Sequence, residues 1–147
     1  MPEGVRRRPA SVYLLAAALL FQGLSGLVGG TSLVMDPTGG VLHMPLSWLE
    51  GSSFKDYLIP GLILLTALGA FPLAALYGVC RRRRWAWRAA STVGVALVIW
   101  IGIEIHIIGY VSSPPLQLIY GSLGAGVLLL ALLPSVRGHL KKNALSG

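Results

Sequence analysis

Four long runs of apolar residues follow one another along this chain of 147 residues, separated by short polar segments. The runs extend over residues 11–35, 57–80, 85–110 and 116–133. As an α-helix, each run is at least about 27 Å long, close to the hydrocarbon thickness of a bilayer, about 30 Å. The pattern predicts an all-α integral membrane four-helix bundle, with residues 1–147 forming a single domain.

The basic residues are concentrated in alternate connecting segments. Eleven of the twelve Lys and Arg residues precede the first run, separate the second from the third, or follow the fourth: Arg6 to Arg8, Arg81 to Arg84, Arg88, Arg137, Lys141 and Lys142. The positive-inside rule places these segments in the cytoplasm. We therefore expect a multi-pass protein of the cell membrane with both termini cytoplasmic. The basic tail, including His139, is expected to be solvated.

The composition supports lipid as the main partner. Hydrophobic residues make up 54% of the chain and charged residues 12%, and the mean hydropathy is +0.73. Soluble domains usually contain about a quarter charged residues. The net charge of +7 comes from short clusters beside apolar runs, where anionic lipid headgroups attract them. The chain has no basic surface large enough to bind a nucleic acid, so we expect no nucleic acid partner.

The segment between the first two runs is the longest polar connection. Residues 36–40 read Asp-Pro-Thr-Gly-Gly and predict a turn. The apolar stretch 41–49 is too short to span a membrane, so we expect a short helical loop that lies over the outer surface as a lid. Ser53 and Asp56 resemble a capping box, which predicts that the second helix begins near Phe54.

Two prolines interrupt the second run. Pro60 and Pro72 cannot donate a backbone hydrogen bond, and each frees the carbonyl group one turn earlier. The sequence therefore predicts a kink at both positions. Such breaks expose carbonyl groups to ions in some transporters, although membrane helices also tolerate proline for structural reasons.

Small residues recur at intervals of four in three of the runs. Helices in lipid pack through such positions, because small side chains let two backbones approach closely. The candidate helix-packing residues are Gly26, Gly30, Ala74, Gly78, Gly121 and Ala125. They serve either packing within the chain or contact with another membrane protein or a second copy.

Glu104 and His106 are the polar residues of the third run that are best suited to bind or transfer protons. A carboxylate at membrane depth costs about 2.5 to 3.5 kcal/mol on insertion scales, and such residues usually have a partner or face water. Glu104 lies six residues before the end of the run, about 9 Å deep. The two side chains are about 200° apart around a helix, so they face different neighbours.

A candidate polar membrane site combines these two residues with Asp36 and His43, which lie on the same side of the membrane. Together they could line a cavity, pass protons or bind a divalent cation. The alternative is that Glu104 and His106 make structural hydrogen bonds to other helices. No pair of residues has the spacing of a metal motif, so we expect neither a metal nor a cofactor.

Catalytic motifs are absent from the sequence. It contains no phosphate-binding GxxxxGK[ST] loop and no GxSxG turn. An enzyme is therefore not the favoured interpretation, and no catalytic residue is predicted.

Three segments, 29–40, 49–61 and 100–109, resemble an uncharacterised family of small bacterial four-span membrane proteins. The resemblance implies a location in the bacterial inner membrane, but it supplies no activity, ligand or catalytic residue.

Two functional hypotheses remain. The first is a non-enzymatic accessory, scaffold or complex-associated membrane protein. The second is a small proton- or cation-coupled transporter that uses Glu104 beneath the outer loop.

Overall fold

The computed structural model describes residues 9–41, 43–50, 52–109 and 116–145, and all of its regular elements are helices. They are α1 (Ala10–Met35), the 3-10 helix η1 (Leu46–Leu49), α2 (Leu58–Leu65), the π-helix η2 (Thr66–Ala70), α3 (Phe71–Cys80), α4 (Ala86–Ile108), α5 (Leu116–Leu132) and α6 (Pro134–Leu145). The prediction of an all-α chain is confirmed for the described residues. Residues 6–8 and 110–115, which the sequence assigned to the first basic cluster and the last turn, lie outside them.

Within the described part of the chain, three helices are long and apolar enough to cross a membrane: α1, the continuous stretch Leu58–Cys80, and α4. A fourth span is present if α5 and α6 count as one, although they are bent by 60° at the break between them. Large apolar side chains such as Val28 and Leu129 are 67% exposed on the outer surface. Soluble proteins rarely expose apolar surface on this scale, which is consistent with a membrane location.

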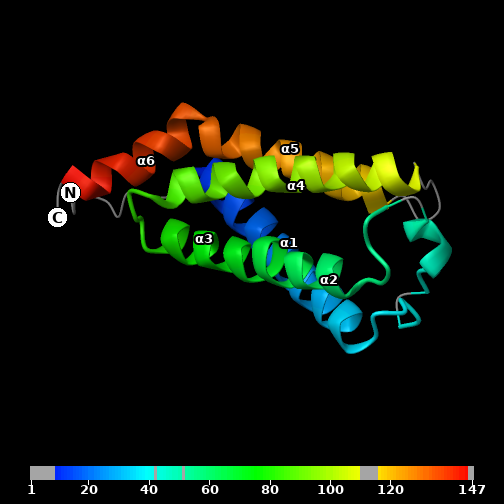
Figure 1. Ribbon diagram of the computed structural model, residues 1–147. Coiled ribbons are helices and arrows are strands. Elements are labelled where there is room, and N and C mark those ends of the chain that lie inside the picture. Colours follow the sequence, from blue (N-terminus) through cyan, green and yellow to red (C-terminus); the bar gives the residue numbers. More distant parts are fainter. Residues whose placement is uncertain (1–8, 42, 51, 110–115, 146–147) are drawn as a thin grey trace.

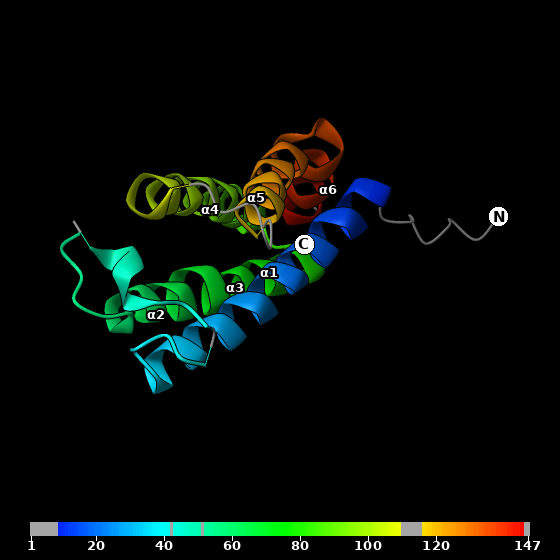
Figure 2. The same cartoon turned by 90° about the vertical axis from the view of Figure 1, so that its right-hand side faces the viewer.

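The helices form two layers. Helix α1 packs against α2, η2 and α3, while α4 packs against α5 (Figure 1). Figure 2 shows the pair α4–α5 on one side of the molecule and α1, α2 and α3 on the other. In Figure 1 the layers meet at the end that carries Arg81–Arg84, here called the arginine end, and diverge at the end where residues 36–57 join α1 to α2, here called the loop end.

The arginine end contains the largest apolar core of the described residues. Five helices contribute to it: α1, α3, α4, α5 and α6. Its fully buried members are Val12, Leu15, Leu19, Ala75, Val79, Ala86, Ala90, Val93, Val127, Ala131, Val136 and Leu140. Trp87 extends this core to the surface, where the guanidinium groups of Arg88 and Arg137 lie 5.5 and 4.6 Å from its ring centre.

The two prolines of the second run act differently from the prediction. Pro60 is the third residue of α2, where its missing N–H has no helical acceptor, so no hydrogen bond is lost and the predicted kink at Pro60 is wrong. Pro72 follows the π-helix η2, which changes the hydrogen-bond register just before the proline. The break predicted at Pro72 therefore takes the form of a π-helical segment.

Helix α1 approaches this π-helix at backbone distance. A Cβ atom on Gly26 would overlap the carbonyl oxygen of Leu68, and one on Gly30 would lie 2.5 Å from the backbone nitrogen of Leu65. From the opposite side, a Cβ atom on Gly69 would lie 2.9 Å from the nitrogen of Leu27. Only glycine fits at these positions, so α1 and the stretch Leu58–Cys80, here called the second span, pack tightly together.

The segment between α1 and α2 begins with the predicted turn. Gly39 has a φ of +80°, and the Asp36 carboxylate accepts hydrogen bonds from the backbone N–H groups of Thr38 and Val41, both at 3.2 Å. The predicted start of the second helix near Phe54 is wrong. Helix α2 begins at Leu58, whose N–H donates to Asp56 Oδ1 at 3.0 Å. The residues between Phe54 and Leu58 belong to the loop and not to the helix.

The C-terminal tail also departs from the expectation. Residues 134–145 form α6, and its Val136 and Leu140 side chains are fully buried in the core. His139, predicted to be solvated, is half-buried. The apolar positions of the tail explain the difference, because they give a polar helix one face that packs on the other helices.

Candidate functional site: a cavity at the loop end

A cavity of about 650 Å³ lies at the loop end, where the two helical layers diverge. Its walls come from α1, α2, α4 and α5, and its cover comes from the segment 36–57. The volume is within the range of small-molecule sites, about 300 to 1,000 Å³. The cavity is partly open, and the rim includes the exposed apolar side chains of Phe21, Val28 and Ile103. The opening therefore lies on the apolar surface of the molecule.

Aromatic side chains form much of the wall. Phe21 of α1 stacks on Tyr120 of α5, with ring centres 6.0 Å apart and planes inclined by 20°. Trp100 of α4 and Phe54 of the loop also line the cavity. The Phe21–Tyr120 pair joins the two layers on one side, so the space between them persists as a defined pocket.

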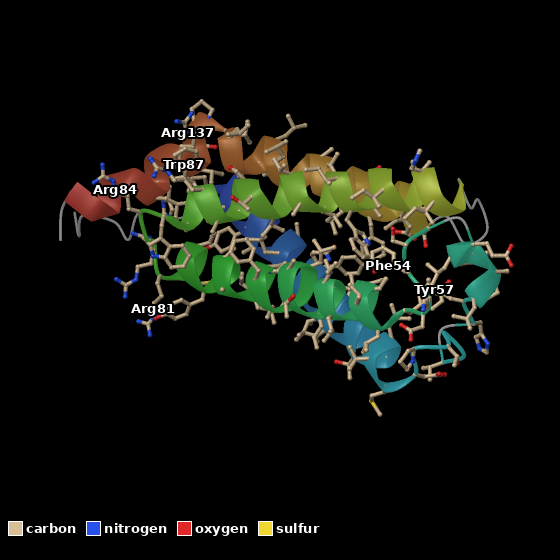
Figure 3. All side chains as sticks on the ribbon, in the orientation of Figure 1. Phe54, Tyr57, Arg81, Arg84, Trp87 and Arg137 are labelled. Carbon is tan, nitrogen blue, oxygen red and sulfur yellow. The ribbon has the colours of Figure 1, made fainter. Side chains whose placement is uncertain are left out.

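The loop covers the cavity through a small apolar cluster. Leu49 and Tyr57 are buried against Leu33 of α1, with Met44 and Phe54 packed beside them. The Tyr57 hydroxyl donates to the carbonyl oxygen of Pro45 at 2.7 Å, which ties the middle of the loop to its C-terminal end. In Figure 3, Phe54 and Tyr57 lie at the loop end between α4 and α2.

Glu104 lines the cavity from α4 and is half-buried. Tyr57, the residue before α2, lines the same cavity from its cover. Burial raises the pKa of the Tyr57 phenol, and the negative charge of Glu104 raises it further. The charge of Glu104, the only acid among the described residues that line the cavity, thus acts on the phenol of the cover.

Gln22 is a polar residue of the cavity that sequence reasoning did not single out. Its side chain is only 1% exposed, and its Nε2 donates to the carbonyl oxygen of Leu68 at 2.9 Å. Leu68 is four residues before Pro72, and in an α-helical register the N–H that proline lacks would donate to this carbonyl. The Gln22 Oε1 atom is buried and has no hydrogen-bond partner. An amide in the first run and a proline in the second were the available signals.

The other three residues of the candidate polar site lie elsewhere. His106 and His43 are exposed and do not line the cavity, and neither does Asp36. The Thr38 hydroxyl donates to Asp36 at 2.5 Å and holds the pKa of that carboxyl group below its usual value, with support from backbone N–H groups. Of the four candidates, the structure therefore brings only Glu104 into the cavity. The described residues contain no group of three His, Cys, Asp or Glu side chains placed to hold a metal ion.

The candidate packing residues divide between buried contacts and the surface. Gly26 and Gly30 form the close contact of α1 described above. A Cβ atom on Gly78 would lie 2.7 Å from the Trp85 ring, whereas one on Gly121 would be 3.5 Å from Ile101, an ordinary distance. Ala74 and Ala125 are exposed.

Neighbouring small residues make the contacts that Ala74 and Ala125 do not make within the chain. Ala75 is fully buried in the core at the arginine end. Gly94 of α4 and Gly124 of α5 bring those helices together, since a Cβ atom on Gly94 would lie 2.9 Å from the Gly124 carbonyl oxygen. The spacing of small residues thus indicated that helices pack through them. Which of the small residues face another helix depends on how each helix is rotated about its axis.

Comparison with known proteins adds no further assignment, because no protein-family model, curated protein or solved structure matches this chain.

Proposed function

We propose that this chain is a small proton- or cation-coupled transporter of the bacterial inner membrane, with the cavity at the loop end as its binding site. Its helices would form a four-helix membrane bundle with both termini in the cytoplasm. The arginine end would lie at the cytoplasmic face, and the segment 36–57 would cover the outer end of the cavity. The observation that carries the proposal is the presence of Glu104 in the wall of a covered, partly open cavity.

The orientation follows from the charges at the two ends. Figure 3 places Arg81, Arg84 and Arg137 at the arginine end, away from Phe54 and Tyr57. The loop segment contains one basic residue, Lys55, and three acids. This asymmetry supports a cytoplasmic arginine end under the positive-inside rule.

The chemistry of Glu104 supports ion coupling. An ionised carboxylate in an apolar cavity is costly unless a proton or another cation neutralises it. A proton and a cationic ligand therefore compete for the same two oxygen atoms. Exchange of one for the other on opposite sides of the membrane is a minimal mechanism for coupled transport.

Flux measurements in liposomes test this function. The purified protein is reconstituted with a pH-sensitive dye inside the vesicles, and a panel of inorganic cations, organic cations, organic anions and neutral solutes is added under a pH gradient. We expect at least one solute to drive proton movement with the wild type and not with Glu104→Gln. Glu50→Gln is the matched control, because it removes the same charge from an exposed position outside the cavity. Elution profiles and melting curves establish that both variants fold. A panel in which no solute gives Glu104-dependent flux would contradict the proposal.

A non-enzymatic accessory or scaffold protein is the second candidate. Small residues on the surface favour it: Ala125 is exposed, and a Cβ atom on Gly102 or Gly126 would meet nothing within 4 Å. Another membrane helix or a second copy of the chain could pack there. Purification in mild detergent tests this candidate, since a stoichiometric partner chain together with no Glu104-dependent flux would favour it over the transporter.

A further inference from the structure

We infer that the ligand of this cavity is a hydrophobic organic cation, such as a protonated amine with an aromatic or aliphatic body. This inference rests on the proposed function and specifies its substrate class. Two properties of the cavity wall carry it, the sign of its charge and its apolar, aromatic surface, and two hydrogen-bond acceptors add to them.

The charge of the wall has one sign. Among the described residues that line the cavity, Glu104 is the only acid, and none is Lys, Arg or His. The remaining titratable groups there are the phenols of Tyr57 and Tyr120, which can lose a proton but cannot gain a positive charge. No group of the wall can compensate a ligand anion, whereas Glu104 can compensate a cation.

Two hydrogen-bond acceptors of the cavity suit a ligand that brings N–H donors. Gln22 donates its Nε2 to Leu68, and its buried Oε1 has no partner. The Tyr57 hydroxyl already donates to Pro45. The Glu104 carboxylate accepts only. A ligand that pairs with the ionised Glu104 carboxylate and with Gln22 Oε1 brings donors, and an ammonium group brings up to three N–H donors together with its charge.

The mostly apolar wall of the cavity favours an apolar body for the rest of the ligand. Phe21, Trp100 and Tyr120 present aromatic side chains to the cavity, and cations bind favourably over such rings. The rim includes the exposed apolar side chains of Phe21, Val28 and Ile103, so a hydrophobic ligand can enter from the surrounding lipid. Along the helix axes Glu104 lies about 6 Å and Gln22 about 20 Å from the loop end of their helices. The apolar body of the ligand can extend between these depths.

Binding of three matched probes tests the charge preference without any variant. Phenylbutylamine, phenylbutanol and phenylbutanoate have the same apolar body with a positive, neutral or negative end. With purified protein in an uncharged detergent, we expect saturable binding of the amine, weaker binding of the alcohol and none of the carboxylate. Equal binding of the three probes, or preference for the carboxylate, would overturn the inference.

Variants and pH identify the responsible group. Glu104→Gln should weaken amine binding by about tenfold or more, the scale of one charged hydrogen bond, while Glu50→Gln should leave it unchanged. For the wild type, the affinity for the amine should fall as the pH is lowered, because protons compete for the Glu104 oxygens. If Glu104→Gln fails to fold, the probe series and the pH profile of the wild type still decide the question.

The flux panel separates this inference from the proposed function. Glu104-dependent proton movement driven by hydrophobic cations supports both. Glu104-dependent movement driven only by an anion, a neutral solute or an inorganic cation would leave the proposed function standing and overturn the inference. An absence of Glu104-dependent flux with every solute would contradict the function itself, whatever the probes bind.

Discussion

The two ends of this molecule are built from the same helices but pack differently. At the arginine end, five helices meet in a core whose members are fully buried. At the loop end, α1 and α2 diverge from α4 and α5, and the space between them is a cavity of about 650 Å³ covered by the loop. Ala and Val make up most of the core at the arginine end, whereas larger aliphatic and aromatic side chains and Glu104 line the cavity at the loop end. Small side chains let helices close on one another, while bulky and polar side chains hold them apart and provide a surface for a ligand.

The largest expected effect on stability comes from a cavity created in the core at the arginine end. Leu15 is fully buried there, whereas the adjacent Leu14 is 60% exposed. We expect Leu15→Ala to lower the free energy of unfolding by about 2 to 5 kcal/mol, because the neighbouring helices cannot collapse into the space. The matched control Leu14→Ala should change it by less than about 0.5 kcal/mol. Denaturant titration in mild detergent, followed by circular dichroism, measures both. Equal effects would show that the core at the arginine end is not packed as described.

The next effect concerns the contact that keeps α1 on the second span. A Cβ atom at Gly26 would overlap the Leu68 carbonyl oxygen and lie 2.7 Å from the Gly69 Cα atom. Gly26→Ala should therefore destabilise the fold by about 1 to 3 kcal/mol. Gly102→Ala provides the control, because nothing lies within 4 Å of the added methyl group and alanine favours a helix by about 1 kcal/mol. The same titration should thus give opposite signs for the two variants.

A smaller effect is expected for the hydrogen bond between Gln22 and Leu68. Gln22→Leu leaves the Leu68 carbonyl group without a donor and should cost about 1 kcal/mol. Pro72→Ala restores an N–H group that can donate to this carbonyl, so Gln22→Leu should cost less in that background. A double-mutant cycle measures the coupling. Additive effects of the two substitutions would show that the proline and the amide act independently.

The smallest effect concerns the loop that covers the cavity at the loop end. Tyr57→Phe removes the hydrogen bond to Pro45 and should cost about 1 kcal/mol. The raised pKa of Tyr57 also predicts a pH dependence. The folded state holds the phenol proton more tightly than the unfolded state, so the stability should fall as the pH rises above about 10. Melting temperatures across this range should fall less steeply for Tyr57→Phe. A parallel decline in both proteins would assign the alkaline sensitivity to other groups.

The candidate site shows where sequence reasoning ends. The cost of a carboxylate in an apolar helix singled out Glu104, and its helical separation from His106 indicated that the two face different neighbours. Both inferences depend on one helix alone. The pairing of Gln22 with the carbonyl freed by Pro72 depends on how α1 is rotated against the second span, and no periodicity within one helix reveals that rotation. For the same reason, the sequence could not reveal that Glu104 lines the cavity while Asp36, His43 and His106 lie outside it.

The sequence by itself determined the helical class, the approximate extent of the apolar helices and the asymmetry of charge between their ends. These properties arise from local periodicity, from helix length and from the composition of each segment. The tertiary structure decided the π-helix before Pro72, the burial of α6 and the cavity beside Glu104. Each of these depends on which faces of separate helices meet, and that choice is made by packing between residues far apart along the chain.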